Sequence, residues 1–331
     1  MRTRLTVGLL VAVLAAGCSA LGGVSAPPVV WTTFVPQTSQ KLLALTIDQR
    51  GMKWIGTDGD GAMALSPDNQ QWIPMTTTAT RKEANTIIDI AVDSQSNLWI
   101  ATLVGVAVVG PNGQTTATYT TGNELPAVPL QDVAIDGAGN PWFATWGGGV
   151  STLDQASDTW TRYTHAEGLL DDRVATIRID SAGNKWIGTA AGISLLTADG
   201  EWREYGPASG FGRGAVWAMV GDIDGSLWCA TQGGGVVLLS ADGQLLGTYT
   251  TQNGLPDDMV NDVLIDTNGN KWFATNNGLA MLSSDRSTIT TFTTANGLGS
   301  NVITELSLDP FGNIWAATYG GGLSLYQPAK Q

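Results

Sequence analysis

The chain has 331 residues, including 42 glycines and 13 tryptophans, and carries a formal net charge of −13. Its hydrophobic content of 43% is too high for a disordered chain, and its acidic balance argues against nucleic acid as a partner. A single histidine excludes histidine-rich metal sites and leaves imidazole catalysis dependent on one position.

The N-terminus has the pattern of a secreted lipoprotein. Arg2 and Arg4 precede an apolar run, residues 5–16, that is shorter than a membrane-spanning helix of about 20 residues. The run ends in Leu-Ala-Ala-Gly directly before Cys18, which resembles the lipobox of bacterial lipoproteins. The sequence therefore predicts a signal peptide over residues 1–17, lipidation of Cys18, for example with palmitate, and a short anchored linker over residues 18–28. The alternative is an ordinary signal peptide with an incidental cysteine.

This pattern also predicts where the protein is located. A lipid anchor places it in the cell envelope, outside the cytoplasm. By resemblance to lipoproteins of cells with two membranes, Ser19 after the cysteine implies the outer membrane if the source has one.

From residue 29 onward the sequence repeats with a period of about 43 residues. Each repeat has a tryptophan, with an aspartate six residues before it and a threonine three residues after it. The tryptophans are Trp54, Trp99, Trp142, Trp186, Trp228, Trp272 and Trp315. The aspartates are Asp48, Asp93, Asp136, Asp180, Asp222, Asp266 and Asp309. Because they recur in every repeat, we interpret both sets as structural.

Each repeat predicts four short strands. Apolar residues alternate before the aspartate, as at Val133 and Ile135, and a turn with Asp, Gly and Asn leads to a second strand that contains the tryptophan. A glycine-rich loop, such as 147–149, precedes a third strand, and an aromatic stretch such as 160–163 forms a fourth. Seven such units predict an all-β fold, a seven-bladed β-propeller of four-stranded antiparallel blades over residues 29–331.

Ring closure is predicted from the two ends of the repeat region. The seventh repeat stops after its third strand, near Tyr326, whereas residues 30–34 resemble an isolated fourth strand. We expect this N-terminal strand to complete blade seven, giving a closed, monomeric ring without an exposed sheet edge.

The repeat resembles a known family. Residues 180–189 (DSAGNKWIGT) and residues 249–256 (YTTQNGLP) are similar to the two-component regulator propeller repeat. The resemblance implies an extracytoplasmic, ligand-sensing propeller, which in the family's hybrid regulators precedes a further β domain, a membrane helix and a histidine kinase. Neither a membrane helix nor a kinase follows residue 328 here, so signalling would require a separate partner, such as a sensor kinase.

Departures from the repeat identify a candidate ligand site. We define the top face as the one that carries the loops between strands two and three and the loops between successive blades. Eleven of the 13 tryptophans fit the repeat, four of them (Trp31, Trp72, Trp160 and Trp202) in fourth strands. The predicted ligand-binding residues, over blades three to five, are Trp146, His165, Arg173, Phe211, Arg213 and Trp217. Aromatic rings and guanidinium groups suit a glycan or another anionic small ligand, and surface packing is the alternative.

A second candidate lies ten residues before the repeated tryptophan, near the predicted channel mouth. Four blades have a carboxylate there: Asp89, Asp132, Asp262 and Glu305. A ring of carboxylates suggests Ca²⁺. The alternative is that these groups hydrogen-bond to neighbouring blades or to the threonine that ends strand two.

The sequence favours a non-catalytic propeller that binds a glycan, a peptide or another small molecule, without a cofactor. Cys229 occupies an apolar repeat position and is expected in the core. Two other functions stay open. The first is a protein-interaction scaffold in a cell-envelope assembly. The second is a propeller lyase that would use His165 with Asp171 and Asp172.

Overall fold

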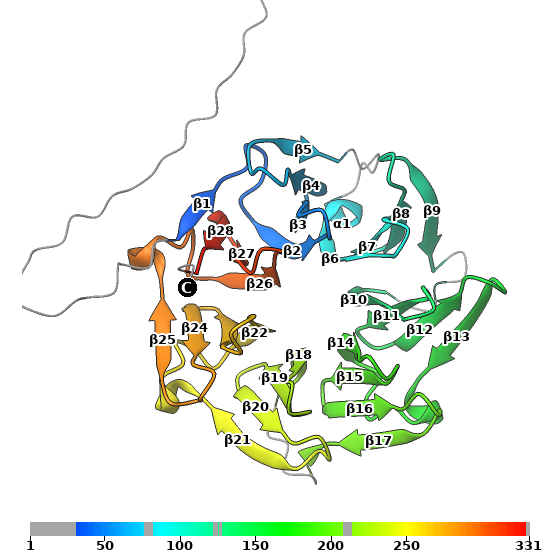
Figure 1. Ribbon diagram of the computed structural model, residues 1–331. Coiled ribbons are helices and arrows are strands. Elements are labelled where there is room, and N and C mark those ends of the chain that lie inside the picture. Colours follow the sequence, from blue (N-terminus) through cyan, green and yellow to red (C-terminus); the bar gives the residue numbers. More distant parts are fainter. Residues whose placement is uncertain (1–30, 76–81, 122–124, 126–127, 208–213, 329–331) are drawn as a thin grey trace, which may run out of the picture.

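The computed structural model describes residues 31–75, 82–121, 125, 128–207 and 214–328. These residues form seven four-stranded antiparallel sheets arranged in a ring (Figure 1), which confirms the predicted seven-bladed β-propeller. The predicted signal peptide, Cys18 and the linker lie outside the described residues.

Each blade runs outward from an inner strand at the ring centre, and we number the blades along the chain. Blade 1 has β2 (Leu42–Ile47), β3 (Lys53–Thr57), β4 (Ala62–Leu65) and β5 (Trp72–Pro74); blade 2 has β6 (Ile87–Val92), β7 (Leu98–Thr102), β8 (Gly105–Val109) and β9 (Thr115–Thr120). Blade 3 has β10 (Leu130–Ile135), β11 (Pro141–Thr145), β12 (Gly149–Asp154) and β13 (Thr159–Tyr163); blade 4 has β14 (Val174–Ile179), β15 (Lys185–Thr189), β16 (Gly192–Leu196) and β17 (Trp202–Tyr205).

The remaining blades follow the same plan. Blade 5 has β18 (Val216–Gly221), β19 (Leu227–Thr231), β20 (Gly235–Leu239) and β21 (Leu245–Tyr249); blade 6 has β22 (Val260–Ile265), β23 (Lys271–Thr275), β24 (Gly278–Leu282) and β25 (Ile289–Phe292). Blade 7 has β26 (Ile303–Leu308), β27 (Ile314–Thr318), β28 (Gly322–Tyr326) and β1 (Thr32–Phe34).

The short helices are α1 (Lys82–Asn85), η1 (His165–Glu167), η3 (Thr251–Asn253) and η4 (Thr294–Asn296). None of the helices in these described ranges has the length and apolar character needed to cross a membrane.

Strand β1 closes the ring as predicted. It pairs antiparallel with β28, with Thr32 opposite Leu325 and Phe34 opposite Leu323. Just before it, the Trp31 side chain is 3% exposed and contacts Trp272 of blade 6. The first strand of the ring and the last blade are therefore held together by both sheet pairing and aromatic packing.

The repeated residues hold each blade together through side-chain hydrogen bonds. In six blades the tryptophan Nε1–H donates to Oδ2 of the aspartate six residues earlier, at 2.9–3.2 Å. The other oxygen of that aspartate accepts backbone N–H groups of the turn, as Asp136 does from Asn140 at 2.8 Å. In all seven blades the threonine Oγ1–H donates to a glycine carbonyl across the next turn, at 2.6–3.0 Å. Hydrogen bonds of this kind give the repeated residues a structural role.

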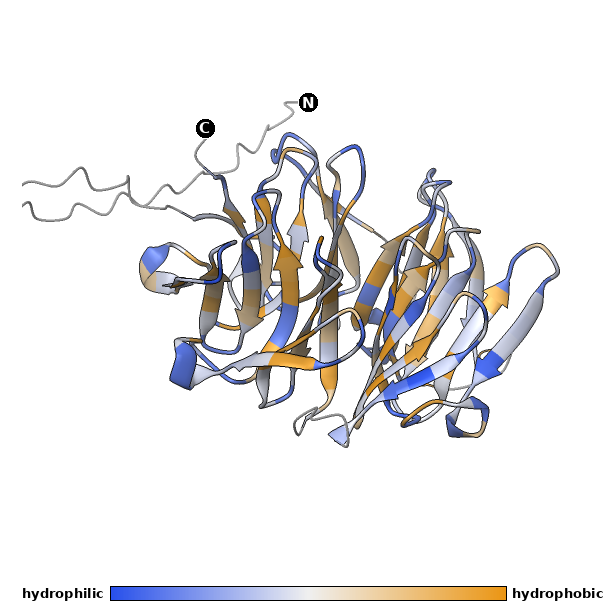
Figure 2. Cartoon of the chain, turned by 60° about the horizontal axis from the view of Figure 1, so that its bottom comes forward, coloured by the Kyte–Doolittle hydropathy of each residue, from blue (hydrophilic) through white to orange (hydrophobic). Residues whose placement is uncertain are grey.

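Apolar side chains fill the space between blades. Hydrophobic segments lie mainly within the strands, several of which also contain hydrophilic segments, and many of the turns are hydrophilic (Figure 2). Cys229 is fully buried in the cluster between blades 4 and 5, and burial raises the pKa of its thiol. Its environment is therefore that of a core residue.

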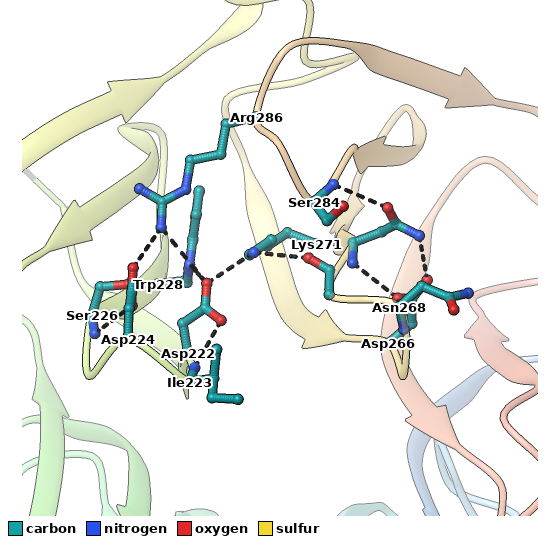
Figure 3. A network of polar contacts seen from close by, with 12 residues as sticks. Asp222, Ile223, Asp224, Ser226, Trp228, Asp266, Asn268, Lys271, Ser284 and Arg286 are labelled. Atoms are coloured by element: carbon teal, nitrogen blue, oxygen red, sulfur yellow. Dashed lines mark hydrogen bonds and ion pairs between the residues drawn. The ribbon is translucent and has the colours of Figure 1, made fainter.

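Three lysines connect neighbouring blades on the face opposite the top. The ammonium groups of Lys53, Lys185 and Lys271 lie 4.6–5.6 Å from the ring centroid of the preceding blade's repeated tryptophan. Lys271 also forms a buried ion pair with Asp222 at 2.8 Å, and Arg286 lies on the other side of the same carboxylate (Figure 3). These contacts make the lower face a structural network.

Candidate functional site

The inner strand of every blade has a β-bulge near its top end. In blade 2, for example, the pairing skips from Ile87 to Asp89, which leaves Ile88 as the extra residue. The bulge residues and their successors line a cavity of about 190 Å³. Because inner strands of all seven blades contribute, this cavity is the top end of the central channel.

The four predicted carboxylates lie in this cavity and link blades. Each accepts a backbone N–H from the inner strand of the next blade, at 2.5–2.8 Å. The donors to Asp89, Asp132, Asp262 and Glu305 are Val133, Ile177, Leu306 and Leu45, respectively. This geometry corresponds to the alternative drawn from the sequence, in which these groups bond to neighbouring blades.

Burial raises the pKa of three of these acids. The pKa of Asp132 lies well above its usual value because of burial and the proximity of Asp89. Burial likewise raises the pKa of Glu305, with further contributions from Asp89 and Asp262, and raises the pKa of Asp262 to about 7. The Asp262 carboxyl is therefore partly protonated near neutral pH.

The calcium prediction gains no support from this geometry. Within the described ranges, no group of three or more His, Cys, Asp or Glu side chains is arranged to hold a metal ion. The four carboxylates are instead engaged with backbone donors of the next blade.

Two residues of the predicted ligand patch lie side by side on the top face. Trp146 and Arg173 are β-bridge partners that connect the strand-two loop of blade 3 to the loop entering blade 4. The loop is fixed further by N–H groups of Gly147 and Gly149, which both donate to the Asp172 carbonyl. Trp146 is nevertheless 37% exposed, so a rigid backbone presents an accessible indole.

The charged groups beside Trp146 are paired with each other. The Arg173 guanidinium donates to both carboxylate oxygens of Asp171, at 3.0 and 2.6 Å. This hydrogen bonding lowers the pKa of Asp171, which keeps the acid ionised. The pair therefore presents donors and acceptors with little net charge.

The remaining patch residues are placed differently. His165 lies in η1, where its Nδ1 is 2.7 Å from the Leu169 carbonyl and its backbone N–H donates to Asp172. Trp217 is the bulge residue of blade 5 and lines the central channel. Phe211 and Arg213 lie outside the described residues.

The structure adds polar residues that the sequence interpretation missed. Gln131, Asn261 and Thr304 are bulge residues of the channel wall. Their sequence signal is weak, since the same position holds Leu43, Ile88 or Ala175 in other blades.

Together these features define a single seven-bladed propeller whose top face combines a polar channel mouth with an exposed tryptophan beside an ion pair. Solved structures with this fold include the extracellular domain of the putative one-component system BT4673 from B. thetaiotaomicron, with a TM-score of 0.77 and 17% identity over 91% of this chain and 40% of that chain. The extracellular domain of the putative hybrid two-component system BT3049 from B. thetaiotaomicron has a TM-score of 0.74 and 20% identity, over 91% of this chain and 42% of that chain.

An enzyme shares the fold as well. A streptogramin B lyase gives a TM-score of 0.72 and 17% identity over 89% of this chain and 96% of that chain. The present chain spans about two fifths of the sensor structures, and identities this low show a common fold. No protein-family model and no curated protein matches the sequence. These sensor domains share the propeller fold that the repeat predicts.

Proposed function

We propose that this protein is a lipid-anchored, extracytoplasmic propeller that binds a glycan on its top face without catalysing a reaction. The observation that carries the proposal is the exposed indole of Trp146, held on a hydrogen-bonded loop beside the Arg173–Asp171 pair. An aromatic face packs against the C–H face of a sugar ring, and an ion pair supplies donors and acceptors for hydroxyl groups.

The pairing of Arg173 favours a neutral glycan over an anion. An anionic ligand would have to compete with Asp171 for the guanidinium, whereas hydroxyl groups bind to a neutralised pair without separating it. Similarity to extracellular sensor domains supports a sensing role, with the signal passed to a separate partner such as a sensor kinase.

Binding is favoured over lyase chemistry by the contacts around His165. Of the two carboxylates in its loop, Asp171 is occupied by Arg173 and Asp172 accepts the His165 backbone N–H. Neither carboxylate orients the imidazole, whose Nδ1 is instead held by the Leu169 carbonyl.

The Trp146→Ala protein is expected to lose at least about tenfold in glycan affinity, because the stacking surface is removed while the loop backbone is retained. The measurement is titration calorimetry with a panel of neutral and acidic oligosaccharides. Phe311→Ala is the matched control, since Phe311 is an aromatic residue, 78% exposed, in a turn on the opposite face. Equal affinities of the Trp146→Ala and wild-type proteins would reject the site, and binding of a protein partner alone would favour the scaffold alternative.

Replacing Cys18 with Ser is expected to abolish acylation and to release the protein from the membrane fraction, because serine lacks the thiol that would carry the lipid. The measurement is intact mass of the detergent-extracted wild-type and Cys18→Ser proteins, each also followed by cell fractionation. Cys229→Ser leaves the predicted anchor unchanged and serves as the control. An unmodified wild-type mass would contradict the anchor without affecting the glycan site.

A further inference from the structure

Blade 1 differs from the other blades at its repeated tryptophan. In blades 2 to 7 this ring contacts an aromatic ring of its own blade's fourth strand, at centroid distances of 5.4–6.1 Å. Within the described residues, Trp54 has neither such an aromatic contact nor a hydrogen-bond partner for its buried Nε1–H. In blade 1 the Arg50 side chain donates two hydrogen bonds to Oδ2 of Asp48, the oxygen that accepts from the tryptophan in the other blades.

Two residues that differ from their equivalents in other blades remove the usual packing around Trp54. In blade 3, the fourth-strand residue opposite Val150 is Tyr163. At the equivalent position of blade 1, opposite Ala62, the residue is Met75. The second of these residues is Thr115 of blade 2, which lies opposite Val109.

The position equivalent to Thr115 has a large apolar residue in other blades. Blade 3 has Trp160 opposite Leu153, and blade 4 has Trp202 opposite Leu196. Those tryptophans reach back to the preceding blade's tyrosine, with centroids 5.5 and 5.8 Å apart. The contact between blades 1 and 2 therefore lacks one ring from each side.

A cavity of about 460 Å³ occupies this place between the outer strands of blades 1 and 2. Trp54, Met75 and Thr115 line it, together with apolar side chains that include Ile73, Leu98 and Val106. Its volume is in the range of small-molecule sites. The six residues that follow Met75, 76–81, are four threonines, an alanine and an arginine, so they supply no large apolar side chain.

We propose that this interblade cavity binds a flat, predominantly apolar aromatic molecule, which takes the place of the two missing rings and packs against the Trp54 indole. Apolar cavities created by loss of large side chains remain dry and bind aromatic molecules. The Trp54 N–H is covered by protein, so the interaction expected with Trp54 is stacking of rings and not a hydrogen bond. This site is separate from the proposed glycan site on blades 3 and 4.

The experiment restores the residues that the other blades have. The neutral fluorescent probe N-phenyl-1-naphthylamine is titrated into the folded wild-type protein and into the Thr115→Trp, Thr115→Leu and Met75→Tyr variants. We expect one saturable site in the wild type, a rise in Tm with probe, and about tenfold or greater loss of affinity in Thr115→Trp. Thr115→Leu introduces the residue that blade 5 has opposite Leu239. Its affinity for the probe is expected to lie between those of the wild type and Thr115→Trp. This variant keeps the test valid if the tryptophan variant does not fold.

Controls separate cavity binding from adsorption to the surface. Thr290→Trp places the same side chain at an exposed position of β25 and should bind the probe as the wild type does. Trp146→Ala should also bind normally, which distinguishes this site from the glycan site. Absence of saturable binding by the wild type, or equal affinity in the wild type and the cavity-filled variants, would overturn the proposal.

Discussion

Replacing Trp31 with Ala is expected to lower the free energy of unfolding by about 3–5 kcal/mol, the usual effect of truncating a fully packed aromatic side chain. Trp31 contacts Trp272, Phe292 and Tyr326, with ring centroids 5.5–6.2 Å apart. It also precedes the three-residue strand that completes blade 7, so its loss weakens ring closure. Urea denaturation followed by circular dichroism measures the effect.

Two variants serve as references for this result. Trp31→Phe keeps a ring and loses no hydrogen bond, because the Trp31 Nε1–H has no partner in the described structure, so its cost should be clearly smaller. Trp146→Ala removes a partly exposed indole and should cost about 1 kcal/mol or less. If Trp31→Ala were as stable as Trp146→Ala, closure by the N-terminal strand would not contribute to stability.

Stability is expected to fall as the pH rises from about 5 to about 8.5, because three channel acids, Asp132, Asp262 and Glu305, bind protons more tightly in the folded than in the unfolded protein. The pKa of Asp262 is raised to about 7, and burial also raises the pKa of Asp132 and of Glu305. The stabilisation from such groups is complete below their unfolded pKa, near 4, and is lost as the pH passes through the folded pKa. For Asp262 alone, the loss over this range is about 2–3 kcal/mol. Thermal unfolding across the range measures it.

Asp262→Asn is expected to flatten this pH dependence and to be more stable than the wild type at pH 8.5, because no charge has to form in the channel. Asp285→Asn is the control. The hydroxyl of Ser283 and the backbone and hydroxyl of Ser287 lower the pKa of Asp285 to about 2, outside the tested range. Measurements stay above pH 5 because acids with a lowered pKa, such as Asp171, lose their stabilising contribution at lower pH. A Tm that is constant or rises between pH 5 and 8.5 would contradict the prediction.

The fold was predictable because its main determinants are local. The repeated aspartate and tryptophan are six residues apart and hydrogen-bond within one turn, as Asp266 and Trp272 do at 2.9 Å. Seven copies of such a unit imply seven blades, and the missing fourth strand of the last repeat implies closure by the first strand. For the candidate site, the sequence placed Trp146 and Arg173 on one face, because the order of strands and loops puts the two loops that carry them at the same end of the blades.

The direction of the Trp217 side chain depends on a local irregularity of its strand. The sequence predicts that Trp217 lies on the top face with Trp146, and the bulge in β18 directs its side chain into the channel mouth on that face. A bulge sets two residues opposite one and shifts the alternation of side chains along the strand. The alternating apolar pattern of the sequence does not reveal this shift.

The sequence by itself determined the number of blades, the strand order and the way the ring closes, since the repeat unit is local and its copies, with the strand that the seventh copy lacks, can be followed along the chain. Only the tertiary structure decided which positions act together across blades. Met75 and Thr115 are 40 residues apart and leave a cavity only because β5 and β9 lie in adjacent blades. Likewise, Asp89, Asp132, Asp262 and Glu305 affect one another because seven inner strands converge on one axis, where burial weakens solvent screening between their charges.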